Sequence, residues 1–227
     1  MPPDSSLPGG PLPFVTIIAM DEEPKRLSMF RSYSPADLLT LANASCGTLS
    51  IFACLSYIAG DRSAQIWAAF ALPVFALIFD VLDGQVARLS ARPQSALGAD
   101  LDSLADIVSF GVAPAVLGYT LGLRGFWDVV VLTYFVCCGI SRLARFNVTS
   151  TALTDTTTGK VRYFEGTPIP TSILLVMIMA VLFQYGRTGA DFAGGHLDLL
   201  GRGFHPFSIL FSISGSLMIS TIRVPKP

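Results

Sequence analysis

Residues 80–88 read DVLDGQVAR and residues 98–106 read GADLDSLAD, and these two segments decide the interpretation of the chain. Asp80 and Asp83 are three residues apart, and Asp102 and Asp106 are four apart. In a helix, either spacing places both carboxylates on one face. The residues between the segments include Pro93 and two serines, which favours a turn between antiparallel helices. We therefore expect four carboxylates to meet on one pair of helices.

Apolar runs surround these segments and indicate a membrane protein. The chain has 227 residues, is 52% hydrophobic and only 14% charged, and has a mean hydropathy of +0.59. Soluble domains carry about 25% charged residues, so this chain lacks the polar side chains to cover a globule in water. An uncharged run of about 20 residues crosses a bilayer. Six runs are expected to do so: Leu38–Gly60, Ser63–Phe79, Ser103–Leu123, Val129–Ser141, Gly166–Gly186 and Pro206–Ile222.

The sequence thus predicts an all-α polytopic membrane protein with six transmembrane helices. Residues 36–223 are expected to form one membrane domain. Residues 1–35 are rich in Pro, Ser and Gly and lack the basic start of a signal peptide. Within them, residues 21–34 favour either a short interfacial helix or a disordered tail.

Basic residues predict the orientation of the spans. With six spans both termini share one side of the membrane, and that side holds eleven of the 15 Lys and Arg residues. Loops rich in Lys and Arg stay in the cytoplasm. We therefore expect both termini and the acidic segments on the cytoplasmic side of the cell or inner membrane. The net charge of −1 excludes neither an acidic nor a basic partner, but no basic face is apparent in the sequence, so we expect no nucleic-acid partner.

Four acids in or beside apolar spans call for a counter-charge. One Asp at the centre of a span costs about 2.5–3.5 kcal/mol on insertion scales, and less near the interface. Mutual repulsion adds to that unless a cation lies among them. All the candidate ligands are hard oxygens, which fit Mg²⁺, Mn²⁺ or Ca²⁺ and do not fit Zn²⁺. Gly84 and Gly98 leave room beside the acids, and Arg88 offers donors to phosphate, so the set indicates phosphoryl-type transfer.

The two segments together resemble the signature of the CDP-alcohol phosphotransferase family, D-x2-D-G-x2-A-R-x(8 or 9)-G-x3-D-x3-D. All eight fixed positions are present, with a spacer of nine residues after Arg88. The resemblance implies that two divalent cations, Mg²⁺ or Mn²⁺, are held by Asp80, Asp83, Asp102 and Asp106. It also implies that Asp106 is the general base and that the CDP pocket is lined by Gly84, Ala87, Arg88 and Gly98. Family members form homodimers, which implies the same here.

The surrounding sequence is similar to the phosphatidylserine synthase branch of the family. The matching residues are Asn43 and Gly47, LDSLAD at 101–106 with VSFGVAP at 108–114, RLARFN at 142–147 and FEGTPIP at 164–170. This similarity implies transfer of a phosphatidyl group from CDP-diacylglycerol to the hydroxyl of L-serine, with release of CMP. Arg142 and Arg145, three apart, are candidates to bind the serine carboxylate.

Other interpretations stay open at this point. Arg142 and Arg145 also suit positive-inside anchors or phosphate binding, so they do not select the alcohol. Another member of the family, such as a phosphatidylglycerophosphate synthase, would show the same acidic pattern. A divalent-cation transporter also uses carboxylates within the membrane, but it has no need for small residues and an arginine at fixed offsets.

Overall fold

The computed structural model describes residues 34–60, 64–89, 96–153, 163–189, 192, 195, 197–199, 202–220 and 223–225. The predicted interfacial segment before Ser34 and the predicted turn at residues 90–95 lie outside these residues. The helices are α2 (Pro35–Ile58), α3 (Ala64–Leu89), α4 (Ala96–Asp106), η1 (Ile107–Val112), α5 (Ala113–Leu121), α6 (Phe126–Leu153), η2 (Ile169–Ser172), α7 (Ile173–Gln184) and α8 (Ser208–Ile219). Short antiparallel strands pair β1 (Tyr163–Glu165) with β4 (Arg223–Pro225) and β2 (Leu197–Leu199) with β3 (Arg202–Phe204). The all-α class is confirmed.

Four helical segments are long and apolar enough to cross a membrane. They are α2, α3, the continuous stretch Leu97–Leu121, and Phe126–Val148 of α6. The fifth and sixth predicted spans correspond to shorter apolar helices, Ile169–Gln184 and Ser208–Ile219. At about 1.5 Å per residue, the 12 residues of α8 are shorter than a hydrocarbon core of about 30 Å. The polytopic membrane architecture is therefore confirmed, with four full-length spans among the described residues.

Helix α3 continues beyond the second apolar run. The uncharged run ends at Phe79, where Asp80 interrupts it, but the helix continues to Leu89, so Asp80 and Asp83 lie on a helix as the sequence predicts. Apart from Gly84, the residues from Asp80 to Leu89 have no strong tendency to break a helix. The first acidic segment is consequently helical throughout, and its two aspartates project from the body of α3.

A capping box fixes the start of α2. The Ser34 hydroxyl accepts a hydrogen bond from the Asp37 backbone N–H, and the Asp37 carboxylate accepts one from the Ser34 N–H at 2.7 Å. Pro35 occupies the first turn, where the missing N–H leaves no bond unmade. This defined start sets which residues of α2 face its neighbours.

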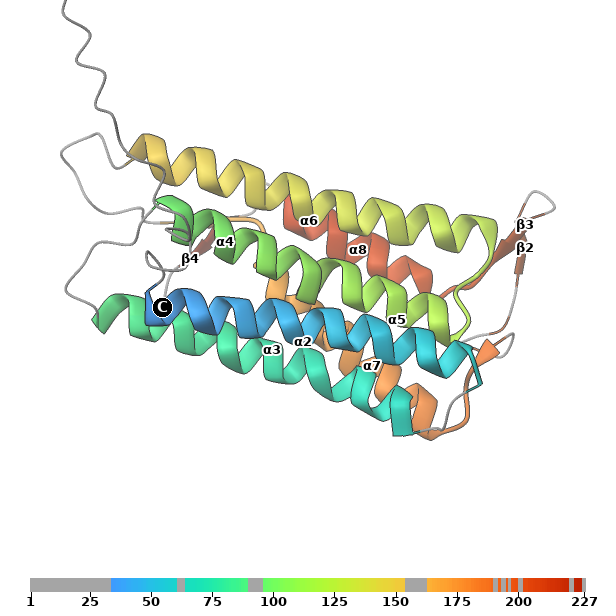
Figure 1. The fold of residues 1–227 in the computed structure, drawn as a ribbon. Helices are drawn as coiled ribbons and strands as arrows, with labels where there is room; N and C mark the ends of the chain where they lie inside the picture. Colours follow the sequence, from blue (N-terminus) through green and yellow to red (C-terminus); the bar gives the residue numbers. More distant parts are fainter. Residues whose placement is uncertain are drawn as a thin grey trace, which may run out of the picture. The chain divides into compact units, whose positions relative to one another are not determined.

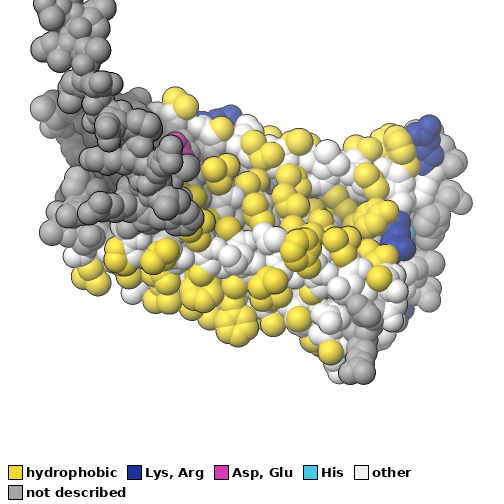
Figure 2. All heavy atoms as spheres, viewed as in Figure 1, with side chains coloured by type: hydrophobic (Ala, Val, Ile, Leu, Met, Phe, Trp, Pro, Cys, Tyr) yellow, Lys and Arg dark blue, Asp and Glu magenta, His cyan; other side chains and the backbone are white. Residues whose placement is uncertain are grey.

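The helices pack side by side and leave an apolar surface outward. Helix α2 lies along α3 and also contacts α4, η1 and α5, while α6 packs on α8 (Figure 1). Hydrophobic side chains cover much of the face of the bundle seen in Figure 2, and Lys and Arg side chains gather mainly near the end that carries β2 and β3. Large apolar side chains such as Leu38 and Phe52 are 61% and 57% exposed. So broad an exposed apolar surface suits lipid rather than water.

A π-helical turn lies at the centre of the third span. The stretch from α4 to α5 passes through η1, where six residues adopt π-helical geometry. Ser109, Phe110 and Gly111 of η1 are buried against the neighbouring helices. π-Helical turns inside α-helices occur frequently at functional sites, and this one begins directly after Asp106.

Candidate active site

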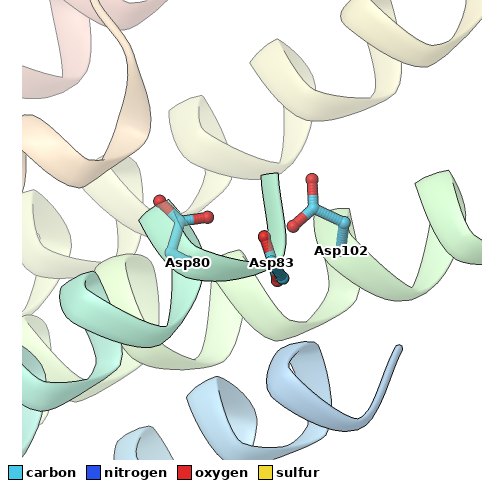
Figure 3. A group of neighbouring side chains, drawn as sticks. All are labelled: Asp80, Asp83 and Asp102. Carbon is cyan, nitrogen blue, oxygen red and sulfur yellow. The ribbon is translucent and has the colours of Figure 1, made fainter. Parts of the chain in front are cut away.

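Three aspartates from two helices form one cluster. Asp80 and Asp83 project from α3 and Asp102 projects from α4, and one carboxylate oxygen of each lies within 4.8 Å of the others (Figure 3). Asp83 is buried, whereas Asp80 and Asp102 are half-buried. The helical spacing in the sequence therefore brings these carboxylates together as predicted.

Asp106 completes the predicted set of four. It lies at the end of α4, one turn beyond Asp102, and its side chain is 7% exposed. Its carboxyl group contacts that of Asp80 on α3. All four predicted aspartates thus belong to one site between α3 and α4.

The electrostatics of this site suit a bound cation. Within the described residues, no Lys, Arg or His forms an ion pair within 4 Å of the four carboxylates. One oxygen of Asp102, Oδ1, is buried without a hydrogen-bond partner. Clustered hard oxygens with a spare buried ligand atom are what a divalent cation such as Mg²⁺ or Ca²⁺ coordinates, so the residues present fit a divalent metal ion.

Two residues of α2 donate hydrogen bonds to the acidic cluster, and sequence reasoning gave neither a role. The Thr40 hydroxyl donates to Asp83 Oδ2 at 2.7 Å, and the Asn43 side-chain amide donates to Asp106 Oδ1 at 3.2 Å. The sequence interpretation used Asn43 only as a point of family similarity. The available signal was weak: Thr40 and Asn43 lie three apart and so share a helical face, but the same span also holds Ser45, Thr48, Ser50 and Ser56.

The residues predicted to line a nucleotide pocket flank the cluster. Gly84 follows Asp83 directly, and a Cβ built on it meets nothing within 4 Å, so open space lies beside it. Gly98 is buried in the first turn of α4, Ala87 is half-buried, and Arg88 is exposed near the end of α3. The pocket-lining role of these four residues stays a prediction.

The structure distinguishes the two predicted serine-binding arginines. Arg142 of α6 is half-buried, with its guanidinium 5.9 Å from the centroid of the Phe146 ring, and its charge acts on Asp106. Arg145, three residues further along α6, is exposed. Only Arg142 is thereby linked to the acidic cluster.

Asn147 connects the same part of α6 to α4. Its side-chain amide donates to Asp100 at 3.2 Å, and its side-chain oxygen accepts from the Ser103 hydroxyl at 3.1 Å. Asp100 and Ser103 bracket Asp102 in the chain. These bonds attach α6, which carries Arg142, to the helix that carries Asp102.

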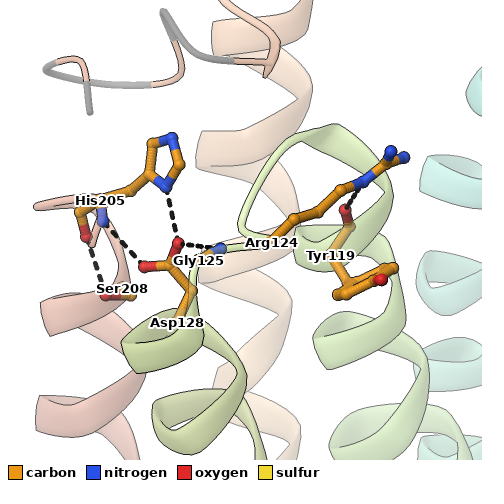
Figure 4. Close-up of polar contacts among 6 residues, drawn as sticks. All are labelled: Tyr119, Arg124, Gly125, Asp128, His205 and Ser208. Atoms are coloured by element: carbon orange, nitrogen blue, oxygen red, sulfur yellow. Dashed lines mark hydrogen bonds and ion pairs between the residues drawn. The ribbon is translucent and has the colours of Figure 1, made fainter. Parts of the chain in front are cut away.

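A second buried acidic centre lies elsewhere in the bundle. Asp128, at the start of α6, contacts His205 Nδ1 at 2.6 Å and accepts bonds from the backbone N–H groups of His205 and Gly125 (Figure 4). Ser208 in turn donates to the His205 carbonyl at 2.8 Å. A cavity of about 510 Å³ reaches His205 and Arg124 at this end. None of the residues in this centre belongs to the acidic signature.

Comparison with protein families decides the membership of this chain. The model of the family described as CDP-alcohol phosphatidyltransferase matches residues 33–214. The chain belongs to this family. The match begins just before the capping box of α2 and includes every residue of the acidic site.

Three curated relatives have names that refer to serine or to a serine-containing lipid. A CDP-diacylglycerol–serine O-phosphatidyltransferase of Saccharomyces cerevisiae is 42% identical over 204 residues, covering 88% of this chain and 73% of its own. The enzyme of the same name from Helicobacter pylori strain J99 is 37% identical, covering 84% and 71%. An archaetidylserine synthase of Methanothermobacter thermautotrophicus is 35% identical, covering 84% and 69%. No solved structure matches the chain.

Membership in the CDP-alcohol phosphatidyltransferase family resolves the class of function. The acidic residues belong to a transferase domain that fills most of the chain. The alternative of a divalent-cation transporter is therefore set aside. The protein is an integral membrane enzyme of lipid metabolism.

Proposed function

We propose that this protein transfers the phosphatidyl group of CDP-diacylglycerol to the hydroxyl of L-serine, giving phosphatidylserine and CMP. The observation that carries the proposal is the acidic cluster between α3 and α4 in a chain 42% identical to a transferase named for this reaction. The apolar surface of the bundle supports a lipid donor, because its acyl chains remain in the bilayer while the headgroup reaches the carboxylates.

Bond making and breaking centre on Asp106. Its carboxylate takes the proton from the serine hydroxyl as the serine oxygen bonds to the phosphorus that carries diacylglycerol. The bond from that phosphorus to the bridging oxygen of CMP breaks, and CMP leaves as a phosphate monoester. The hydrogen bond from the Asn43 amide to Oδ1 of Asp106 holds this carboxylate in place for the step.

Asp80, Asp83, Asp102 and Asp106 would hold two divalent cations. A divalent cation held there, Mg²⁺ or Mn²⁺, would neutralise charge on the pyrophosphate and on departing CMP. The close approach of oxygens from Asp80, Asp83 and Asp102, together with the spare buried oxygen of Asp102, supports this ligand set.

The remaining predicted residues bind the two substrates. Gly84, Ala87, Arg88 and Gly98 line the pocket for CDP, and the open space beside Gly84 supports this. Arg142 and Arg145 bind the carboxylate of serine. Arg142 is the better placed of the two, since it is half-buried and its charge acts on Asp106.

The proposal includes a place in the cell and an arrangement of the chain. Residues 36–223 form the six-helix catalytic domain and residues 1–35 a cytoplasmic or interfacial segment. The bias of Lys and Arg in the sequence supports an active site and both termini in the cytoplasm, with the protein in the cell or inner membrane. The homodimer implied by the family resemblance is part of the same proposal.

The test uses the purified full chain in detergent–lipid micelles with CDP-diacylglycerol and Mn²⁺ or Mg²⁺. Serine, glycerol 3-phosphate and inositol phosphate are offered separately, and CMP release is followed. Release that depends on serine, and that is lost in Asp106→Asn, supports the proposal. Release with glycerol 3-phosphate alone would keep the chemistry and replace the acceptor.

A further inference from the structure

We infer that Asn43 and Thr40 of α2 are positioning residues, each orienting a different aspartate of the acidic site for a different task. Asn43 orients Asp106 for proton transfer, and Thr40 orients Asp83 for metal binding. The inference rests on the proposed function, because it assigns the two carboxylates the roles given above. It adds α2 to a site whose acidic signature lies wholly in α3 and α4.

The contact between Asn43 and Asp106 is buried and has a defined direction. Asn43 is 0% exposed, and its Nδ2 lies 3.2 Å from Asp106 Oδ1. A carboxylate accepts hydrogen bonds only, so the amide nitrogen must face it. The opposite atom, Asn43 Oδ1, is buried without a hydrogen-bond partner. A buried amide left half-unsatisfied is unfavourable for the fold alone, which favours a role at the site over a role in packing.

A second hydrogen bond holds the backbone of Asn43 in place. The Ser109 hydroxyl donates to the Asn43 carbonyl oxygen at 2.9 Å, and Ser109 is itself 0% exposed. Ser109 belongs to η1, the π-helical turn that follows Asp106. The segment that carries Asp106 is therefore attached to Asn43 at two points.

A glycine permits this close approach. A Cβ on Gly47, one turn after Asn43, would lie 2.7 Å from the Cα of Ser109 and 3.0 Å from its backbone nitrogen. The first separation is shorter than real Cβ atoms show and the second is at the limit, so glycine allows η1 to lie this near α2 without a shift of the backbone. The sequence Asn43-x3-Gly47 thus supplies the amide and the space that the amide contact requires.

Thr40 makes the corresponding contact with the other carboxylate. Its hydroxyl lies 2.7 Å from Asp83 Oδ2 in a buried setting, and it is 4% exposed. The Thr40 hydroxyl also lies 3.2 Å from the Ala36 carbonyl oxygen, so it has two acceptors within hydrogen-bonding distance. Asp83 belongs to the cluster of three carboxylates, whereas Asp106 is the proposed base. Residues three apart on α2 therefore contact two different carboxylates, one proposed as a metal ligand only and the other proposed as the base as well.

The test compares isosteric variants of the full chain in lipid micelles. Asn43→Leu and Thr40→Val keep volume and remove the donors. Turnover with CDP-diacylglycerol and serine gives kcat and KM, and electron paramagnetic resonance of free Mn²⁺ gives metal binding without turnover. We expect Asn43→Leu to lower kcat about 30-fold while Mn²⁺ binding and the KM for serine change less than about 3-fold. We expect Thr40→Val to weaken Mn²⁺ binding about 5- to 10-fold.

Ser50→Ala is the matched control. Ser50 lies on the same helix, is 0% exposed, and donates a buried hydrogen bond to the Ala69 carbonyl at 2.8 Å, away from the aspartates. If both positioning variants behave as this control does, with equal losses of thermal stability and unchanged kcat and Mn²⁺ binding, the inference is wrong. Asn43→Gln, which restores a donor, should recover part of kcat; no recovery alongside a stable fold would also count against it.

Failure of the inference differs from failure of the proposed function. If the native chain releases CMP with another alcohol and not with serine, the acceptor is wrong, and the same variants are compared with that alcohol. If the native chain turns over serine and Asn43→Leu does so equally fast, the function stands and the positioning role is excluded.

Discussion

The bundle contains two buried acidic centres that differ in what balances their charge. Asp128 accepts hydrogen bonds from two backbone N–H groups, at 2.8 and 3.0 Å, and faces His205 Nδ1 at 2.6 Å. At the other centre, four carboxylates share two donors from α2, and an oxygen of Asp102 has none. Protein groups face the carboxylate of the first centre, whereas the second has few donors for its carboxylates and could hold a metal ion.

This difference suits a structural role for Asp128 and a role in the reaction for the aspartates of α3 and α4. Asp128 ties the turn before α6 to the segment that follows β3, so its bonds maintain the connection of helices (Figure 4). The aspartates of α3 and α4 repel one another when no cation is bound, which destabilises the fold. A cation bound among them would offset this repulsion. Burial alone therefore does not identify a functional acid, but burial without sufficient donors does.

The largest expected effect comes from Asp106→Asn. We expect serine-dependent CMP release to fall about 1,000-fold, because the amide cannot accept the proton. In EDTA the melting temperature should stay equal or rise, since one repelling charge is removed. Turnover and thermal unfolding of the same preparations check this. If Asp106→Asn instead lost activity because its melting temperature fell strongly, Asp106 would have a structural role like that of Asp128, and the two centres would not differ.

Asp128→Asn should show the reverse pattern. Removing the charge from a buried, hydrogen-bonded pair costs about 3 kcal/mol, so the melting temperature should fall clearly. The kcat of the fraction that remains folded should change less than about 3-fold, because Asp128 is no part of the acidic signature. Thermal unfolding of Asp128→Asn, together with its kcat measured at low temperature, tests both expectations. A large loss of kcat in a stable variant would instead give this centre a role in the reaction.

Metal should stabilise the protein through one centre only. Mn²⁺ at about 100 times its dissociation constant should add about 2.7 kcal/mol of stability to the native chain. Asp83→Asn should lose most of this gain, because Asp83 belongs to the cluster of three, whereas Asp128→Asn should keep it. Melting curves with Mn²⁺ and with EDTA measure the difference. Equal gains in all three proteins would place the metal elsewhere.

The smallest effects concern the two arginines. Arg142→Ala should raise the KM for serine about 10-fold, because its half-buried guanidinium acts near Asp106. Arg145→Ala should change that KM less than about 3-fold, since Arg145 is exposed. Initial rates over a range of serine concentrations test both, and Arg124→Ala at the other centre is the control. A larger effect at Arg145 would mean that serine binds nearer to Arg145 than to Arg142.

Sequence and structure agree best where a short helical spacing determines geometry. The i, i+3 and i, i+4 positions of the aspartates were enough to predict the acidic cluster, because a helix fixes which side chains share a face. The uncharged run stops at Phe79, ten residues before the end of α3, so hydropathy marks only the apolar part of this helix and the spacing of the aspartates indicates that it continues. Helices continue through charged residues when those residues face a polar interior.

Contacts between distant segments escaped prediction. Thr40 bonds Asp83 across 43 residues and Asn43 bonds Asp106 across 63, so no local pattern pairs them. The π-helical turn after Asp106 has no distinctive composition, and the short strand pairs lie in stretches without strand periodicity. The bond between His205 and Asp128 likewise joins residues that only the packing of α6 against α8 brings together.

The exposed apolar side chains of α3 determine the kind of kinetics this enzyme should follow. Val81 and Leu82, which separate Asp80 from Asp83 in the chain, are 50% and 40% exposed. The acidic centre is thus about one helix diameter from the acyl chains of the surrounding leaflet. For the proposed donor, encounter takes place in two dimensions, so the rate should depend on its mole fraction in the bilayer. Diluting CDP-diacylglycerol with inert lipid at a fixed bulk concentration should therefore slow the enzyme.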